Sequence, residues 1–183
     1  FPHVVLINRT LPSLPLNTKT IVVDEEAGMI QAVTLFVQQG RRRIAFVAGP
    51  THSFSGQRRR RAFWSACQQH GIVGSSESIA DCDPTRDRGY TATQALFETV
   101  PDVDSIVAFN DLVAVGVMEA CRQNGRFIPQ DVAVIGIDDI PLAALVTPTL
   151  STLRINKYGL GEQGMRTLLQ LIGNGRNTAL ASQ

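Results

Sequence analysis

Polar side chains that could bind a ligand directly follow three apolar runs of the sequence. They are, in chain order, Asn8 after residues 4–7, Asn110 with Asp111 after residues 105–109, and Asp138 with Asp139 after residues 132–137. Carboxylates and amides accept hydrogen bonds, and amides also donate them. Two adjacent acids could instead hold Mg²⁺, but the sequence has no glycine-rich phosphate loop to accompany a metal. The pattern indicates a polar binding site at strand ends, with a metal site as the weaker alternative.

Two of these acids suit helix capping better than ligand binding. Asp111 precedes the helical pattern "LVAVGVMEACRQ" and is expected to accept hydrogen bonds from the first amides of that helix. Asp139 is expected to cap the short segment "IPLAAL" in the same way. Asn110 and Asp138 therefore remain as the candidate ligand-binding residues after these two runs.

A run of four arginines, residues 58–61, is the strongest positive feature. Consecutive helical residues point in different directions, so only one or two of the four can reach a common site. Arg59 lies four residues before Phe63, which with Ala66 and Cys67 forms a stripe suited to burial. We expect Arg59 to point toward the strand ends and the other three arginines into solvent. A guanidinium there could bind vicinal hydroxyls or a carboxylate.

Residue types typical of catalysis and metal binding are scattered. The three histidines lie far apart, and Ser53 and Ser55 have neither a Gly-x-Ser-x-Gly turn nor an evident acid to orient a base. Cys67, Cys82 and Cys121 form no CxxC pair, so free thiols are expected rather than a zinc site or a disulfide framework. The sequence predicts a protein that is no enzyme and that needs no cofactor or metal.

The elements that must position these residues alternate between two patterns. Short β-branched runs predict strands at residues 4–7, 20–23, 44–48, 105–109 and 132–137. Helical spacing predicts helices at residues 25–40, 57–70, 88–99, 112–123 and 158–172. Strands that are apolar on both faces belong in parallel sheets covered by helices, where ligands bind beyond the carboxyl ends. The expected fold class is therefore α/β, with a doubly wound parallel sheet.

Composition narrows the class of partner. The chain has 183 residues and a net charge of +1, which suits one or two globular units and gives no general reason to bind a polyanion. Its apolar runs are far shorter than the roughly 20 residues that cross a bilayer, and no basic leader precedes one. A soluble protein with no membrane partner is expected.

Several motifs together carry a family resemblance. They are "VVLINR", "GRRRIAFVAGP", "RRRAF", the long stretch from "IVAFNDL" through "PQDVAVIGIDD" to "TPTLSTLRI", and "GEQGMRTLLQLI". Over essentially its whole length, the chain resembles the effector-binding core of the LacI/GalR family of bacterial transcriptional regulators. The resemblance implies a periplasmic binding protein-like type I fold. It also implies that Arg59, Asn110 and Asp138 hydrogen-bond a small effector and that Asn8 does so from the hinge side.

The resemblance further implies domains and partners. Residues 1–22 would be part of an amino-terminal effector subdomain, 23–155 a nearly complete carboxyl-terminal subdomain, and 156–183 a crossover helix returning to the first. The implied partners are a sugar, sugar derivative or nucleoside, a second copy of the chain, and operator DNA bound through a helix-turn-helix head that is absent from this chain. The expected location is the cytoplasm. A periplasmic-type sugar-binding protein of a transport system is the alternative.

Four further expectations come from departures from the family pattern, from an apolar surface and from the start of the chain. Cys82 stands where family members often present an aromatic ring, which leaves the effector open. The helix at residues 112–123 is expected to expose Val113, Val117 and Ala120 and, with residues 142–146, to form a two-fold interface. We also expect the strand at residues 4–7 to need pairing on both sides. Because the chain would lack half of the cleft, its own effector affinity is expected to be weak.

Overall fold

The chain forms two compact units. A computed structural model describes residues 3–11, 13–14 and 17–180, with side chains as far as residue 173. One unit comprises Phe1–Val23 with Asn156–Gln183, and the other comprises Asp24–Ile155. The second unit carries most of the buried residues and is described first.

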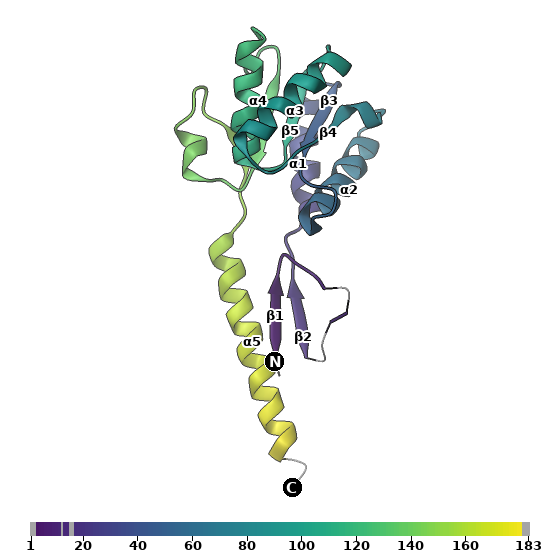
Figure 1. Ribbon diagram of the computed structural model, residues 1–183. Helices are drawn as coiled ribbons and strands as arrows, with labels where there is room; N and C mark the ends of the chain where they lie inside the picture. Colours follow the sequence, from purple (N-terminus) through teal and green to yellow (C-terminus); the bar gives the residue numbers. More distant parts are fainter. Residues whose placement is uncertain (1–2, 12, 15–16, 181–183) are drawn as a thin grey trace. The chain divides into compact units, whose positions relative to one another are not determined.

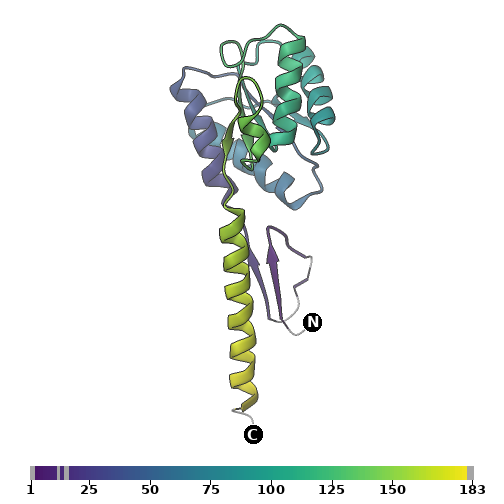
Figure 2. The same cartoon turned by 90° about the vertical axis from the view of Figure 1, so that its left-hand side faces the viewer.

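The larger unit is a five-stranded parallel sheet between two pairs of helices (Figures 1 and 2). Its strands are β3 (Ile44–Ala48), β4 (Ile79–Asp81), β5 (Ser105–Ala108), β6 (Ala133–Ile137) and β7 (Ser151–Leu153). Its helices are α1 (Glu25–Gln38), α2 (Phe54–Gln69), α3 (Arg86–Thr99) and α4 (Asp111–Gln123), with short 3₁₀ turns η1 (Ser76–Ser78) and η2 (Pro141–Ala144). Helix α1 packs on α2 and α3 packs on α4, so each pair covers one face of the sheet. The predicted doubly wound α/β class is confirmed.

The strand order β4-β3-β5-β6-β7 places a switch point between β3 and β5. From the carboxyl end of β3 the chain runs outward to β4, whereas from that of β5 it runs the opposite way to β6. Two loops that diverge leave a crevice beyond the strand ends, which is where doubly wound sheets bind ligands. The residues that follow β3, β5 and β6 are therefore the place to look for a site.

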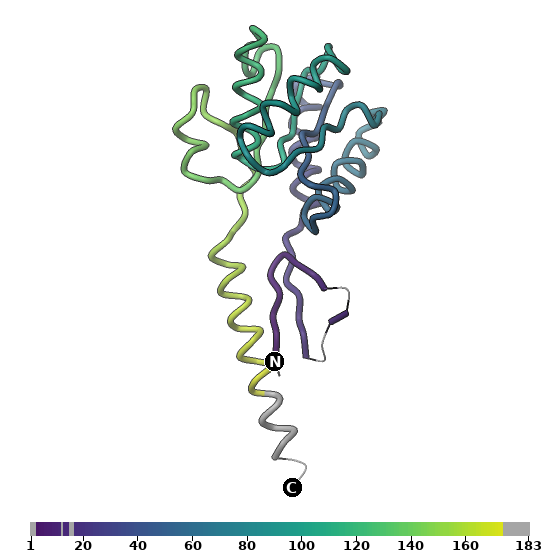
Figure 3. Tube along the Cα trace, in the orientation of Figure 1, coloured from purple at the N-terminus to yellow at the C-terminus, as the bar shows by residue number. Residues whose placement is uncertain are grey.

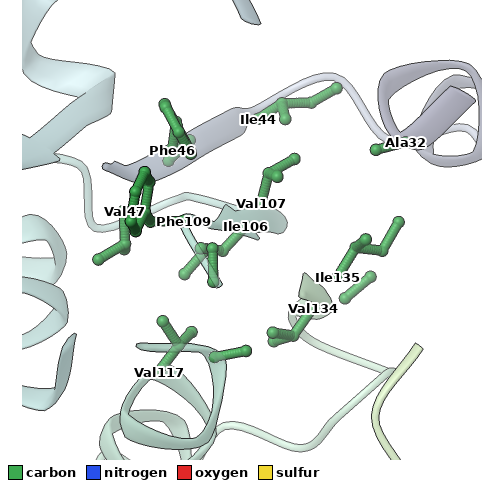
Figure 4. Packing of buried hydrophobic residues seen from close by; sticks show 14 of the residues in the cluster. Ala32, Ile44, Phe46, Val47, Ile106, Val107, Phe109, Val117, Val134 and Ile135 are labelled. Atoms are coloured by element: carbon green, nitrogen blue, oxygen red, sulfur yellow. The ribbon is translucent and has the colours of Figure 1, made fainter. Parts of the chain in front are cut away.

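The core explains why the central strands lack an alternating pattern. Every residue of β3, β5 and β6 is buried, because helices cover both faces. Neighbouring positions still alternate in direction. In Figure 4, Ile106 and Val134 point to the side of Val117 on α4, and Val107 and Ile135 point to the side of Ala32 on α1. The partners Ile106 and Val134, and Val107 and Ile135, are in register across β5 and β6, so each face is a continuous apolar layer.

The smaller unit contains the remaining described elements (Figure 3). Strand β1 (Val4–Ile7) pairs in parallel with β2 (Thr18–Ile21), and α5 (Lys157–Leu180) packs against both. Among the described residues β1 has this one strand partner, so its other edge is unpaired. Within the described part of the chain, no helix has the length and apolar character needed to cross a membrane.

Most predicted elements are present, with a few corrections. Strand β2 begins two residues earlier than expected, and α5 extends beyond the predicted residue 172. Strands β4 and β7 were missed because each is three residues long and lies at an edge of the sheet, where a short partly exposed strand leaves little apolar pattern.

The expected apolar surface on α4 is wrong. Val113, Val117 and Ala120 are wholly buried, because α4 packs against α3 as well as against the sheet. An isolated helical pattern cannot show that two neighbours cover it. Large apolar side chains that remain exposed on α4 and in the segments after it include Leu112, Phe127, Leu142 and Leu145.

The buried thiols predict a pH dependence of stability. All three cysteines are free, and burial raises the pKa of Cys67 from its ordinary value of 9.0 to about 11 and that of Cys121 to about 12. A raised folded-state pKa contributes stability that is present below the unfolded-state pKa and is lost as pH rises toward the folded-state pKa. Urea titrations should show a loss of about 1 kcal/mol per buried cysteine between pH 8 and pH 10. A Cys67→Ala, Cys121→Ala double variant should lose most of that dependence, and an unchanged dependence would contradict this account.

Candidate functional site

Arg59 lies beyond the carboxyl ends of β5 and β6 and is almost fully buried. Its Nε donates to Glu25 Oε2 at 2.9 Å, one Nη donates to the main-chain oxygen of Phe109, and the guanidinium stacks 4.8 Å from the centroid of the Phe109 ring. The other Nη lies 3.9 Å from Asp138 Oδ1. Phe109 directly follows β5 and Asp138 directly follows β6, so Arg59 of α2 reaches the ends of two central strands. The packing of Phe63, Ala66 and Cys67 on the same helix holds it there.

Glu25 holds the guanidinium from the other side. It lies in the first turn of α1, and its side chain is 4% exposed. Carboxylates are stabilised at a helix amino terminus, and Asp24 caps this one by accepting from the amide of Ala27. Glu25 Oε2 binds Arg59, whereas Oε1 is buried and accepts no hydrogen bond from the described residues. This carboxylate therefore has an acceptor that the fold itself leaves unused.

The two adjacent acids form a turn with unusual backbone angles. Asp138 has φ of 115° and Asp139 has φ of 52°, both in the positive region that side chains disfavour. Three successive amides fix this turn. Asp138 N donates to Leu153 O at 2.9 Å, Asp139 N donates to Thr152 Oγ1, and Ile140 N donates to Asp111 Oδ2 at 2.8 Å. Strained backbone persists where surrounding contacts determine it, and here they aim the Asp138 carboxylate toward Arg59.

The expected capping roles of Asp111 and Asp139 are wrong. Asn110 is the N-cap of α4, with its Oδ1 accepting from the amide of Val113 at 2.9 Å. Asp111 is the first residue of the helix and is completely buried, where it accepts from Ile140 N and from the hydroxyl of Thr152. The η2 turn has no side-chain cap. Asp139 instead forms an ion pair with Arg154, 2.5 Å from Nε to Oδ2.

Asn110 and Asn8 occupy comparable positions in different units. Each closely follows a strand: Asn8 is the first residue after β1, and Asn110 is the second residue after β5. With its oxygen engaged by the cap, Asn110 can present its amide nitrogen as a donor. Asn8 has φ of 52°, and its main-chain N–H donates to Ile21 O at 2.7 Å. The structure thus joins Arg59 and Asp138 directly, places Asn110 after the neighbouring strand, and describes Asn8 within the smaller unit.

The other arginines of the run depart from the expected exposure. Arg61 is exposed, but Arg58 and Arg60 are only partly so. The guanidinium of Arg58 lies over the ring of Phe54, and Arg60 forms an ion pair with Asp81, the last residue of β4. The long aliphatic stems of arginines cover neighbouring apolar surface while the charge reaches a partner, which sequence spacing alone does not reveal.

A pocket of about 460 Å³ lies beyond the ends of β3 and β4. It is lined by Pro50, Thr51, His52, Asp81, Cys82, Asp83, Arg88, Thr91, Ala92 and Ala95. Burial, with the nearby Asp83 and Asp81, raises the pKa of the Cys82 thiol to about 11, so the thiol is neutral at pH 7 and is no activated nucleophile. In the described part of the chain, no group of three His, Cys, Asp or Glu side chains is arranged to hold a metal ion.

Sequence reasoning missed Glu25 and Phe109. Acids in the first turn of a helix are common, so "DEEAG" gives no sign that one of its acids is buried against an arginine 34 residues later. In the sequence, Phe109 is the last residue of an apolar run that predicts a strand. Its contact with the Arg59 guanidinium becomes apparent only in the packed structure. The one available signal was that Glu25 is the acid adjacent to the N-cap.

Comparisons with known proteins agree on one family. The model of the periplasmic binding protein-like domain matches residues 33–182. The transcriptional regulator CelR of Thermobifida fusca is 31% identical over 150 residues, which are 82% of this chain and 44% of CelR. The repressor CytR of Escherichia coli K12 is 28% identical over 95% of this chain and 52% of its own length. The chain therefore spans about half the length of these relatives.

A solved structure gives the same answer for the fold. The complex of the transcriptional regulator CelR with cellobiose superposes with a TM-score of 0.86 at 29% identity, covering 93% of this chain and 52% of that one.

Proposed function

Since the chain belongs to the periplasmic binding protein-like family, as the effector-binding domain of a LacI-family transcriptional regulator, we propose that it senses a small, hydroxyl-rich effector. The observation that carries this proposal is the pairing of Arg59 with Asp138 beyond the carboxyl ends of the central strands β5 and β6. A sugar, a sugar derivative or a nucleoside offers the hydroxyls that such a pair can bind.

The chemistry of a hydroxyl group fits this pair. Arg59 can donate and Asp138 can accept, and a hydroxyl does both at once. The 3.9 Å between their nearest atoms is an ion-pair distance that is longer than a hydrogen bond, so the donor and the acceptor lie close enough together to bind one hydroxyl. The Asn110 side-chain amide would add a second donor, and Asn8 is a further proposed effector-binding residue.

The full-length protein would couple effector binding to transcription. We propose that it binds operator DNA through a separate head and works in the cytoplasm, as befits relatives named as transcriptional regulators. Those names favour a regulator over the transport-type binding protein. They also favour sensing over catalysis.

The test is a ligand screen followed by an Asp138→Ala variant. Thermal-shift measurements on the full-length protein with sugars, sugar acids and nucleosides should identify a compound that raises the melting temperature, because a ligand that binds the native state stabilises it. Calorimetry with that compound should then show a loss of about 1 to 3 kcal/mol of binding free energy for Asp138→Ala.

The adjacent acid provides a matched control. Asp139→Ala removes a carboxylate that is paired with Arg154, so affinity should stay within about threefold, or about 0.6 kcal/mol, of the unchanged protein. Loss of binding on Asp139→Ala together with unchanged binding on Asp138→Ala would reverse the assignment.

The regulator would act as a homodimer. We place the interface at the exposed leucines Leu112, Leu142 and Leu145, because exposed apolar side chains favour self-association when a second copy of the chain buries them. Light scattering should give the mass of a dimer, and Leu145→Glu should reduce it to that of a monomer. Val73→Glu, at an exposed apolar residue after α2, is the control and should leave the mass unchanged. A dimer that survives Leu145→Glu would place the interface elsewhere.

A further inference from the structure

We infer that Glu25 makes the site selective for uncharged effectors, so that a neutral sugar or nucleoside binds and its acidic or phosphorylated counterpart does not. The inference rests on the proposed function and refines it. The residue types alone left two options for Arg59, namely hydroxyls or a carboxylate. The contacts of Glu25 decide between them.

The guanidinium of Arg59 already has its counter-ion. Glu25 Oε2 lies 2.9 Å from Arg59 Nε, and the two side chains are 4% and 5% exposed, so the pair is shielded from solvent. An arginine recruits an anionic ligand strongly when its charge is otherwise unmatched, and a buried carboxylate removes most of that attraction. Arg59 can still donate hydrogen bonds, but as part of a neutral pair.

The geometry of the donors leads to the same conclusion. Glu25 occupies Nε and the main-chain oxygen of Phe109 occupies one Nη position, so the bidentate edge that Arg uses for carboxylates and phosphates is partly engaged. The remaining Nη faces Asp138 at 3.9 Å. An anionic oxygen placed there would approach a carboxylate, whereas a hydroxyl could accept from Arg59 and donate to Asp138.

The second oxygen of Glu25 strengthens the selection. Oε1 is buried and accepts no hydrogen bond from the described residues, so it is an acceptor that lacks a donor. A hydroxyl or amino group of a ligand can donate a hydrogen to a carboxylate. A carboxylate or phosphate group of a ligand has no hydrogen to donate and adds a like charge.

The experiment compares matched neutral and anionic probes on the full-length protein. The pairs are glucose with glucuronate, glucose with glucose 6-phosphate, galactose with galacturonate, cellobiose with cellobionate, and adenosine with its 5′-monophosphate. Thermal shift identifies the pairs that bind, and calorimetry gives the ratio of affinities. We expect the neutral member to bind at least tenfold more tightly than its anionic partner.

Two isosteric variants assign the selectivity to one carboxylate. Glu25→Gln keeps an oxygen that can accept from Arg59 Nε but removes the charge, so the ratio should fall at least threefold. Glu26→Gln changes the exposed acid next to it, which accepts from Ser65, and should leave the ratio unchanged. A merely structural role for Glu25 would alter the melting temperature of the unliganded protein without altering this ratio.

The possible outcomes separate the inference from the proposed function. If an anionic member binds as tightly as its neutral partner, or if Glu25→Gln leaves the ratio unchanged, the inference is wrong and the sensing function stands. If no probe of either kind raises the melting temperature, the proposed effector class fails and the inference fails with it.

Discussion

Replacing Arg59 with alanine is expected to lower the free energy of unfolding by about 3 to 5 kcal/mol and to abolish measurable effector binding. The change leaves the Glu25 carboxylate buried without its partner and removes the cation that stacks on Phe109. It also deprives the main-chain oxygen of Phe109 of its donor. Urea denaturation measures the first effect, and calorimetry with a ligand found by the thermal-shift screen measures the second.

Two further variants make the Arg59 result specific. Arg61→Ala, two residues along the same helix at an exposed position, should cost no more than about 0.5 kcal/mol. A Glu25→Met, Arg59→Met double variant should recover much of the stability, because neither side chain then leaves an uncompensated buried charge. Binding should stay lost in that double variant. Recovery of binding with stability would show that Arg59 serves the fold alone.

Replacing Asp111 with alanine is expected to cost about 3 kcal/mol of stability, and to weaken effector binding as well. Asp111 is completely buried and accepts from Ile140 N at 2.8 Å and from the Thr152 hydroxyl at 2.5 Å. Its loss leaves both donors unsatisfied. It also removes one of the three contacts that hold the strained turn of Asp138 and Asp139, so the Asp138 carboxylate should no longer be aimed at Arg59.

The control for Asp111 is an acid in the first turn of another helix. Asp87 lies in the first turn of α3 and is exposed, so Asp87→Ala should change the free energy of unfolding by about 0.5 kcal/mol or less. Both variants are compared by urea denaturation. A cost below about 1 kcal/mol for Asp111→Ala would mean that the turn is held without it.

The residues that could be found from the sequence are those whose signal is local. The strands at residues 4–7, 44–48 and 105–108 follow from short apolar runs, and burial of Phe63, Ala66 and Cys67 follows from helical spacing. Arg59 followed from the same spacing, since a helix that buries Phe63 must direct the residue four positions earlier to the same side. Parallel strands align their carboxyl ends, so the location of the site followed from the class of fold.

The partner of each polar residue was decided only by the tertiary structure. Asn110 and Asp111 are both residue types that commonly cap helices. Asn110 is the N-cap of α4, because the carboxylate of Asp111 accepts hydrogen bonds from Ile140 and Thr152, which come from other parts of the chain. Asp139 does not have its expected capping role, because it forms an ion pair with Arg154, which also comes from another part of the chain. Glu25 and Arg59 are 34 residues apart, and no pattern links them.

The physical reason for this division is the range of the forces involved. Apolar periodicity predicts helices and strands from residues that are close together in the sequence. Burial of their apolar faces then determines the layers of the fold, but it does not specify single contacts. A buried charge gains stability only from a partner within hydrogen-bonding distance, and that distance is set by the packing of α1, α2 and the strand ends together. The sequence by itself therefore determined the α/β layers and the edge at which we propose that a ligand binds, whereas the packed structure decided that Arg59 lies there already paired with Glu25.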